Sequence, residues 1–132
     1  MKILIVDDDF QNREIIRARL EQAGFEVAEA VNGDEGLETA VKENADLIIL
    51  DIMMPQKDGW QVCKAVKANP RLKHVPVIVL TACIQGIDEL RSWESGADEF
   101  ISKPADPALL LESIERLLKG GETHAANAVP KS

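Results

Sequence analysis

Aspartates stand directly after two short apolar runs of this sequence, and a lysine stands after a third. The residues are Asp7, Asp8, Asp9, Asp51 and Lys103. Three carboxylates close together repel one another, so such a group either binds a cation or takes up a proton. Oxygen ligands of this kind suit Mg²⁺ or Mn²⁺. A carboxylate beside a divalent ion can also be the nucleophile of phosphoryl transfer, with a lysine charge on the phosphoryl oxygens.

The runs that precede these charged residues span 2–6, 47–50 and 99–102. Short runs of Ile, Leu and Val without alternation are typical of strands buried on both faces, in a parallel sheet covered by helices. Ligands of such a sheet bind outside the carboxyl ends of the strands. The charged residues are therefore expected at the edge where chemistry takes place. Thr81, at the end of the run 75–81, is expected at the same edge.

Five strand–helix units follow one another in a single domain, residues 1–120, and residues 121–132 are expected to be a flexible tail or linker. The fold class is α/β, a doubly wound five-stranded parallel sheet of flavodoxin-like order 2-1-3-4-5 with helices on both faces. That order places strands 1 and 3 side by side, so the aspartates that follow them should meet. The predicted strands are 2–6, 25–30, 45–51, 75–81 and 98–102, and the predicted helices are 10–23, 33–43, 60–68, 84–95 and 107–119.

Several side chains of these elements have an expected environment. Ile15, Ile16 and Leu20 recur at helical spacing and are predicted to face the core. Asp9 and Asp106 are expected to cap the helices that follow them, because an Asp before the first helical residue accepts hydrogen bonds from free backbone N–H groups. The strand 25–30 alternates apolar and polar residues, which is typical of a half-exposed edge strand.

The composition limits the classes of function. The chain has 132 residues, 45% of them apolar, and a net charge of −8. This acidity argues against direct binding to nucleic acid or to an anionic membrane surface. Cys63 and Cys83 fit no metal or redox motif and are expected to be reduced thiols in or near the core. The apolar runs are too short for a signal peptide or a membrane span, so a cytoplasmic protein is expected.

Taken together, these motifs resemble the receiver domain of two-component response regulators. The resemblance spans residues 1 to about 119, with the motifs in the order and spacing of that family. The segments that carry it are 3–9, 50–55 with Asp58 and Gly59, 79–82 and 100–104.

The resemblance implies a role for each residue of the predicted site. Asp51 is the phosphoacceptor, and Asp7 and Asp8 hold Mg²⁺ (or Mn²⁺) with it. The backbone carbonyl of Met53 adds a further metal ligand.

The same resemblance also indicates which residues bind the phosphoryl group and which form the conformational switch. Lys103 and Thr81 bind the phosphoryl group on Asp51. Thr81 and Phe100 form the switch pair: the hydroxyl moves toward the phosphate and the ring turns inward behind it.

The resemblance also implies partners. A histidine kinase or a histidine phosphotransfer protein supplies the phosphoryl group. An output protein reads the face built by residues 84–95, 98–102 and 107–119, and a homodimer formed on phosphorylation is a further expected partner. The chain is expected to accept a phosphoryl group and to lose it slowly, with no other enzymatic activity and no output domain of its own.

Other functions remain as alternatives. The chain could be a phosphorelay intermediate, or the receiver segment of a larger output protein. An aspartate-nucleophile phosphatase of the haloacid dehalogenase type usually needs an Asp two residues after the nucleophile, where this chain has Met53. A flavodoxin-like binding module would need a loop rich in Ser, Thr and Gly after the first strand. The acidic residues 7–9 stand there instead and would repel a phosphate.

Overall fold

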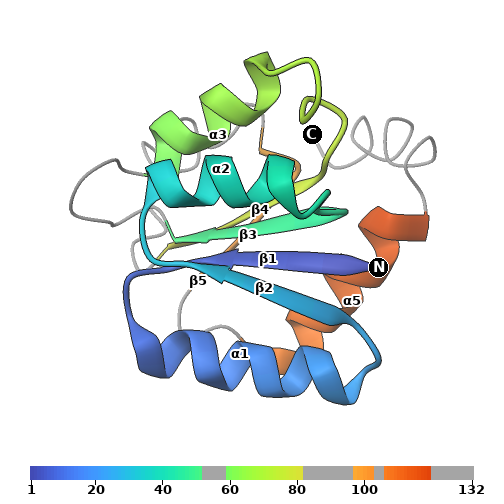
Figure 1. The fold of residues 1–132 in the computed structure, drawn as a ribbon. Helices are drawn as coiled ribbons and strands as arrows, with labels where there is room; N and C mark the ends of the chain where they lie inside the picture. Colours follow the sequence, from blue (N-terminus) through green and yellow to red (C-terminus); the bar gives the residue numbers. More distant parts are fainter. Residues whose placement is uncertain (52–58, 82–96, 103–105, 120–132) are drawn as a thin grey trace.

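A parallel sheet with helices on both faces forms the domain (Figure 1). The computed structural model describes residues 1–51, 59–81, 97–102 and 106–119. The sheet has five strands in the order β2-β1-β3-β4-β5, which is the predicted order. The strands are β1 (Lys2–Val6), β2 (Glu26–Ala30), β3 (Leu47–Asp51), β4 (Val77–Thr81) and β5 (Glu99–Ser102).

Two helices cover each face of the sheet in the described part of the chain. In Figure 1, α2 and α3 lie above the sheet, and α1 and α5 lie below it. The predicted helix 84–95 lies outside the described residues. No helix of the described part is long and apolar enough to cross a lipid bilayer. The helices are α1 (Phe10–Gln22), α2 (Gly33–Lys42), α3 (Gly59–Ala68) and α5 (Pro107–Lys119).

The alternation of side chains along each strand divides the core into two layers. Leu4 and Val6 of β1 pack in the layer that contains Ala40 of α2 and Val62 of α3. The neighbours of these residues on β1, Ile3 among them, pack in the layer of α1 and α5. The central strands are buried on both faces, which explains why their sequences are continuous apolar runs.

The edge of the sheet differs from its centre. Among the described strands β2 pairs only with β1, and its first residue is exposed while the next three are half-buried. The predicted half-exposed edge strand is therefore confirmed. Cys63 is buried in the core, as expected, whereas Cys83 lies outside the described residues.

One prediction about the core is wrong. Ile15 is 62% exposed, whereas Arg13 is only 8% exposed. The residues of α1 that face the sheet are Arg13, Ile16 and Leu20, spaced by three and four. Ile15 stands about 100° from Ile16 around the helix axis, which directs it to solvent. Two adjacent isoleucines could not both lie on so narrow a stripe.

Four strands begin later than predicted, β2 and β5 by one residue and β3 and β4 by two. The N–H of Ala45 donates to the carbonyl of Ala40 at the end of α2, 3.1 Å away. The N–H of Val75 donates to the carbonyl of Leu72, 2.8 Å away, within the turn after α3. Both residues are buried, but their backbones close turns instead of joining the sheet.

The predicted helix caps are present. The carboxylate of Asp9 accepts hydrogen bonds from the N–H groups of Gln11 and Asn12 at the start of α1. Asp106 accepts one from the N–H of Ala108, 2.9 Å away, at the start of α5. Each cap satisfies backbone donors that have no partner within the helix. The cap at Asp9 also fixes where the chain turns after β1.

Candidate metal and phosphoryl site

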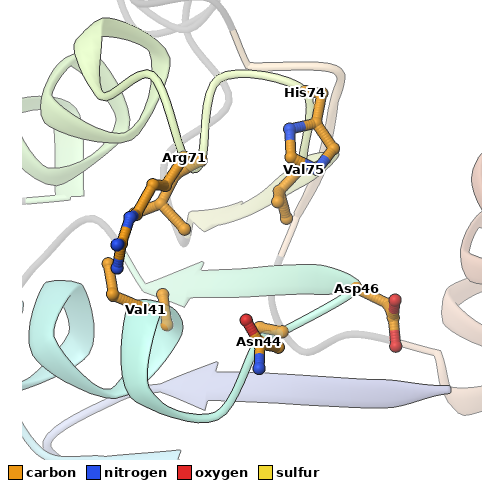
Figure 2. Close-up of a pocket in the computed structure, with 9 residues that line it drawn as sticks. Val41, Asn44, Asp46, Arg71, His74 and Val75 are labelled. Atoms are coloured by element: carbon orange, nitrogen blue, oxygen red, sulfur yellow. The ribbon is translucent and has the colours of Figure 1, made fainter.

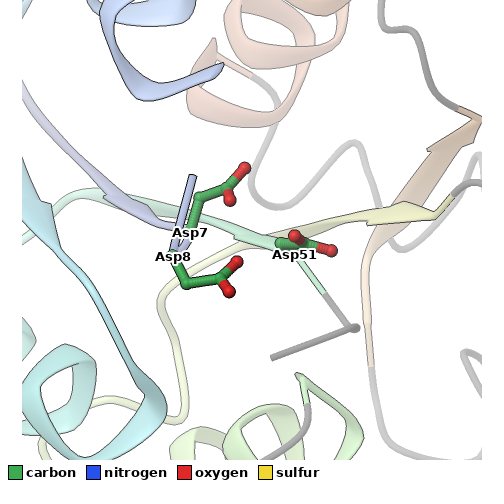
Figure 3. Close-up of side chains that lie close together, drawn as sticks. All are labelled: Asp7, Asp8 and Asp51. Atoms are coloured by element: carbon green, nitrogen blue, oxygen red, sulfur yellow. The ribbon is translucent and has the colours of Figure 1, made fainter. Parts of the chain in front are cut away.

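Asp7, Asp8 and Asp51 meet at the carboxyl edge of the sheet (Figure 3). One carboxylate oxygen from each residue lies within 4.8 Å of the others. We call these three residues the aspartate cluster. The strand register brings Asp7 and Asp51 together, because Val6 of β1 pairs with Leu50 of β3 and an aspartate directly follows each of these two residues.

The aspartate cluster lies partly inside the protein. Asp7 is 1% exposed and Asp51 is 4% exposed, whereas Asp8 faces solvent. Ionised carboxylates removed from water and placed close together raise the energy of the folded chain unless a positive charge compensates them. The cluster therefore favours binding of a cation from the solvent side, where Asp8 lies.

The donor set fits Mg²⁺ or Mn²⁺. Its three described side chains offer oxygen atoms only, and the exposed position of Asp8 leaves room for water on the ion. Mg²⁺ prefers oxygen ligands and keeps several of its waters, so one or two carboxylates with solvent access suit it better than a closed cage. Asp7, Asp8 and Asp51 would hold the ion.

Backbone hydrogen bonds hold the turn that carries Asp7 and Asp8. The N–H of Asp7 donates to the carbonyl of Ala30 at 3.1 Å, which extends the β1–β2 pairing by one residue. The N–H of Asp9 donates to Asp7 Oδ1 at 2.9 Å and orients that carboxylate. The carbonyl of Asp7 accepts a hydrogen bond from Arg13 Nη1 at 2.7 Å. The position of Asp7 is thus fixed at its N–H, its carboxylate and its carbonyl.

The sequence pattern did not indicate that Arg13 lies beside the turn that carries Asp7 and Asp8. Its Nε donates to Glu29 Oε1 at 2.9 Å, and Glu29 Oε2 accepts a further bond from Arg17. The ring of Phe10 lies 5.6 Å from the Arg13 guanidinium carbon. A charged residue in register with Ile16 and Leu20, on the apolar stripe of a helix, is the sequence signal that could have revealed it.

The structure describes part of the remaining predicted site. Thr81 is the last residue of β4, and Asp51 pairs with Leu80 immediately before it, so the backbone of Thr81 lies beside the end of β3. Phe100 lies within β5. Met53 and Lys103 lie outside the described residues.

A hollow lies at the opposite edge of the sheet from the aspartate cluster (Figure 2). It is located where α2 ends, β3 begins and the turn after α3 passes. In a doubly wound sheet the functional edge is the carboxyl edge, and this hollow is at the amino ends of the strands. We therefore do not place the chemistry there. Its lining residues include Val41, Asn44, Arg71, Leu72, His74 and Val75.

Comparison with known proteins identifies the family. Residues 3–115 match the response regulator receiver domain. The chain belongs to this family. Receiver domains act in signal transduction by two-component systems, as signalling switches. The match includes every member of the aspartate cluster.

Solved receiver structures have the same fold. The chemotaxis protein CheY4 of Vibrio cholerae superimposes with a TM-score of 0.84 at 34% identity, over 89% of this chain and 98% of that one. The signal receiver domain of a histidine kinase from Syntrophus aciditrophicus superimposes with the same TM-score of 0.84 at 39% identity, over 90% of each chain. These similarities extend over nearly the whole of each receiver domain.

Curated relatives are longer proteins. The DNA-binding dual master transcriptional regulator RpaA of Synechocystis is 39% identical over 118 residues, which are 89% of this chain and 49% of RpaA. The response regulator PleD of Caulobacter vibrioides is 36% identical over 118 residues, which are 26% of its length. This chain therefore spans half or less of these two relatives.

Proposed function

We propose that this receiver domain is a phosphorylation-activated switch in which Asp51 accepts a phosphoryl group. The donor is a phosphohistidine on a histidine kinase or on a histidine phosphotransfer protein. The observation that carries the proposal is the aspartate cluster, which gathers three carboxylates at the functional edge of the sheet with two of them buried.

The reaction follows from the chemistry of these groups. A carboxylate oxygen of Asp51 attacks the phosphorus, the bond from phosphorus to the imidazole nitrogen breaks, and the electron pair of that bond stays on the imidazole. The divalent ion, when bound, neutralises the charge that gathers on the phosphoryl oxygens. Asp7, Asp8 and Asp51, together with the backbone carbonyl of Met53, would hold this ion.

Two further residues bind the phosphoryl group once it is attached to Asp51. The ammonium of Lys103 and the hydroxyl of Thr81 donate hydrogen bonds to the phosphoryl oxygens, and such charge-assisted bonds are strong. Thr81 and Phe100 then change conformation together. Driving a two-state equilibrium from 1:99 to 99:1 requires about 5.5 kcal/mol, which a group carrying up to about two negative charges can supply through several new bonds.

The partners follow from the same proposal. An output protein binds the face that contains β5 and α5, together with residues 84–95, and a homodimer through this face is the alternative arrangement. The domain itself binds neither nucleic acid nor membrane, since its net charge is −8. The domain is a cytoplasmic switch. It loses its phosphoryl group slowly and does not turn over other substrates.

A second candidate function is the receiver segment of a longer regulator or a step in a phosphorelay. The lengths of RpaA and PleD favour it, because this chain corresponds to only part of each. In that case the same reaction at Asp51 controls a domain outside the present sequence.

The direct test is the intact mass of the protein after incubation with acetyl phosphate and Mg²⁺. The wild type is expected to gain one phosphoryl group, and addition of EDTA before the acetyl phosphate should prevent the gain. Asp51→Asn should gain none. Asp46→Asn, which changes an aspartate at the opposite edge, is the matched control and should react like the wild type. A folded, Mg²⁺-binding wild type that gains no phosphoryl group would refute the proposed function.

A further inference from the structure

We propose that Arg13 is a positioning residue of the metal site, because its guanidinium fixes the peptide that joins Asp7 to Asp8. The inference rests on the proposed function, which makes these two aspartates metal ligands. It adds a residue from the buried face of α1 that touches neither the ion nor the phosphoryl group.

The first step is the contact itself. Arg13 Nη1 donates to the carbonyl oxygen of Asp7 at 2.7 Å, and this contact is buried. That carbonyl belongs to the peptide between Asp7 and Asp8, so the bond sets the plane of this peptide. The plane in turn fixes ψ of Asp7 and φ of Asp8 and so constrains the direction in which both side chains leave the backbone. One hydrogen bond from Arg13 therefore orients two of the three aspartates.

The second step is the rigidity of the guanidinium. The Arg13 side chain is 10% exposed, and its Nε donates to Glu29 Oε1 at 2.9 Å. Glu29 in β2 is held from its other oxygen by Arg17. A guanidinium presents its donors in a fixed planar fork, so binding Glu29 with one nitrogen determines where the other nitrogen points. Arg13 thus links β2 to the turn after β1 and holds the two in a fixed relative position.

The hydrogen bond and the charge of Arg13 have opposite expected effects on the metal site. A guanidinium near a cation site repels the cation, so the charge of Arg13 by itself weakens binding of Mg²⁺. Removal of that charge should raise the affinity if electrostatics dominates. Removal of the hydrogen bond to Asp7 should lower the affinity if positioning dominates. The two explanations predict changes of opposite sign.

The experiment is Mg²⁺ titration calorimetry on Arg13→Met and on Arg17→Met. Both substitutions remove one positive charge and one hydrogen bond to Glu29, but only the first removes the bond to Asp7. Arg13→Met is expected to weaken Mg²⁺ binding by on the order of tenfold, the usual effect of losing a group that orients a metal ligand. Arg17→Met should change it by no more than about twofold, since its ion pairs lie nearer the surface.

The outcomes are distinguishable. The inference is overturned if Arg13→Met binds Mg²⁺ as tightly as Arg17→Met does, or more tightly than the wild type does. If Arg13→Met does not fold, Arg13→Lys carries the test, because lysine keeps the charge and lacks the planar fork; affinity equal to that of the wild type then overturns it. A wild type that binds no Mg²⁺ contradicts the proposed function instead.

Discussion

At the scale of single residues, the aspartate cluster would stabilise a bound divalent ion, and without the ion it destabilises the fold. Asp7 and Asp51 are buried within a few ångströms of each other and of Asp8. Without a cation, their mutual repulsion and their desolvation both favour the unfolded chain. The stability of this domain should therefore depend strongly on divalent ions.

Asp51→Asn should raise the thermal unfolding midpoint in EDTA. The substitution removes one buried charge and keeps the shape, and we expect a gain on the order of 1 kcal/mol in the free energy of unfolding. For a chain of this size that corresponds to roughly 3–5 °C. Differential scanning calorimetry measures it.

Mg²⁺ should reverse the order of the two proteins. A ligand at a hundred times its dissociation constant stabilises the folded state by about 2.7 kcal/mol, and only the wild type has the complete site. The control is Glu38→Gln, which removes an exposed negative charge from α2 and should behave like the wild type in both buffers. An Asp51→Asn midpoint below that of the wild type in EDTA would show that the carboxylate stabilises the fold.

The sequence was sufficient to predict which aspartates meet. Residues that follow adjacent parallel strands lie at one edge whatever the details of packing, and this placed Asp7 beside Asp51. It was not sufficient for Arg13, because its burial depends on Glu29, a residue of another strand that accepts its hydrogen bond. The apolar pattern of a helix predicts that a charged side chain is exposed. The burial of Arg13 becomes clear only when the structure shows its hydrogen bond to Glu29.

At the scale of elements, α2 lies unusually close to β1. Gly36 is buried in α2, and a Cβ atom at this position would lie 2.9 Å from Val6 Cγ2 and 3.1 Å from Val6 Cγ1. The absence of a side chain thus sets the distance between the helix and the strand that ends at Asp7. Since valine is stiff at χ1, its methyl groups cannot turn aside easily.

Gly36→Ala should destabilise the domain. In an ordinary helix interior this change gains about 0.5–1 kcal/mol, but overpacking a core costs about 1–3 kcal/mol, and here the second effect is larger. We expect a net loss of roughly 1 kcal/mol in the free energy of unfolding, measured by urea denaturation.

The matched control for this prediction is a double-mutant cycle with Val6→Ala. Truncating Val6 alone should destabilise the core, but in the Gly36→Ala background it removes the clash and should cost less. Additive effects of the two substitutions, or a Gly36→Ala variant more stable than the wild type, would contradict the close packing.

The order of the sheet was predictable, and the ends of some strands were not. The chain alternates strands and helices with right-handed crossovers, which leaves few arrangements, and the observed order is among them. Ala45 and Val75 were assigned to strands because they are apolar. In the structure their N–H groups close turns, and only hydrogen bonding distinguishes a buried turn residue from a buried strand residue.

At the scale of the whole molecule, the carboxyl and amino edges of the sheet differ in role. The carboxyl edge carries the aspartate cluster. At the amino edge, Asp46 accepts a hydrogen bond from the N–H of Lys2 at 2.7 Å, and Lys67 bridges α3 to Asp98 at 2.9 Å. These bonds join distant segments of the chain where no chemistry is expected, so the amino edge stabilises the fold that positions the site.

The domain is expected to end at residue 120. The sequence predicts that residues 121–132 are not part of the domain, and among the described residues the two core layers extend no further than Leu118. A chain shortened to residues 1–120 should keep the unfolding midpoint of the full chain within about 1 °C, because no core contact of the described part is lost. It should bind Mg²⁺ with the same affinity.

Removal of residues 107–132 is the contrasting truncation, because it deletes α5. Leu110, Ile114 and Leu117 are all at most 3% exposed in the layer shared with α1. Burial of such a side chain contributes about 1.5–3 kcal/mol, and three of them amount to much of a typical stability of about 5–15 kcal/mol. This chain should not fold, which circular dichroism would show. A lower midpoint for residues 1–120 than for the full chain would mean that the last twelve residues pack on the domain.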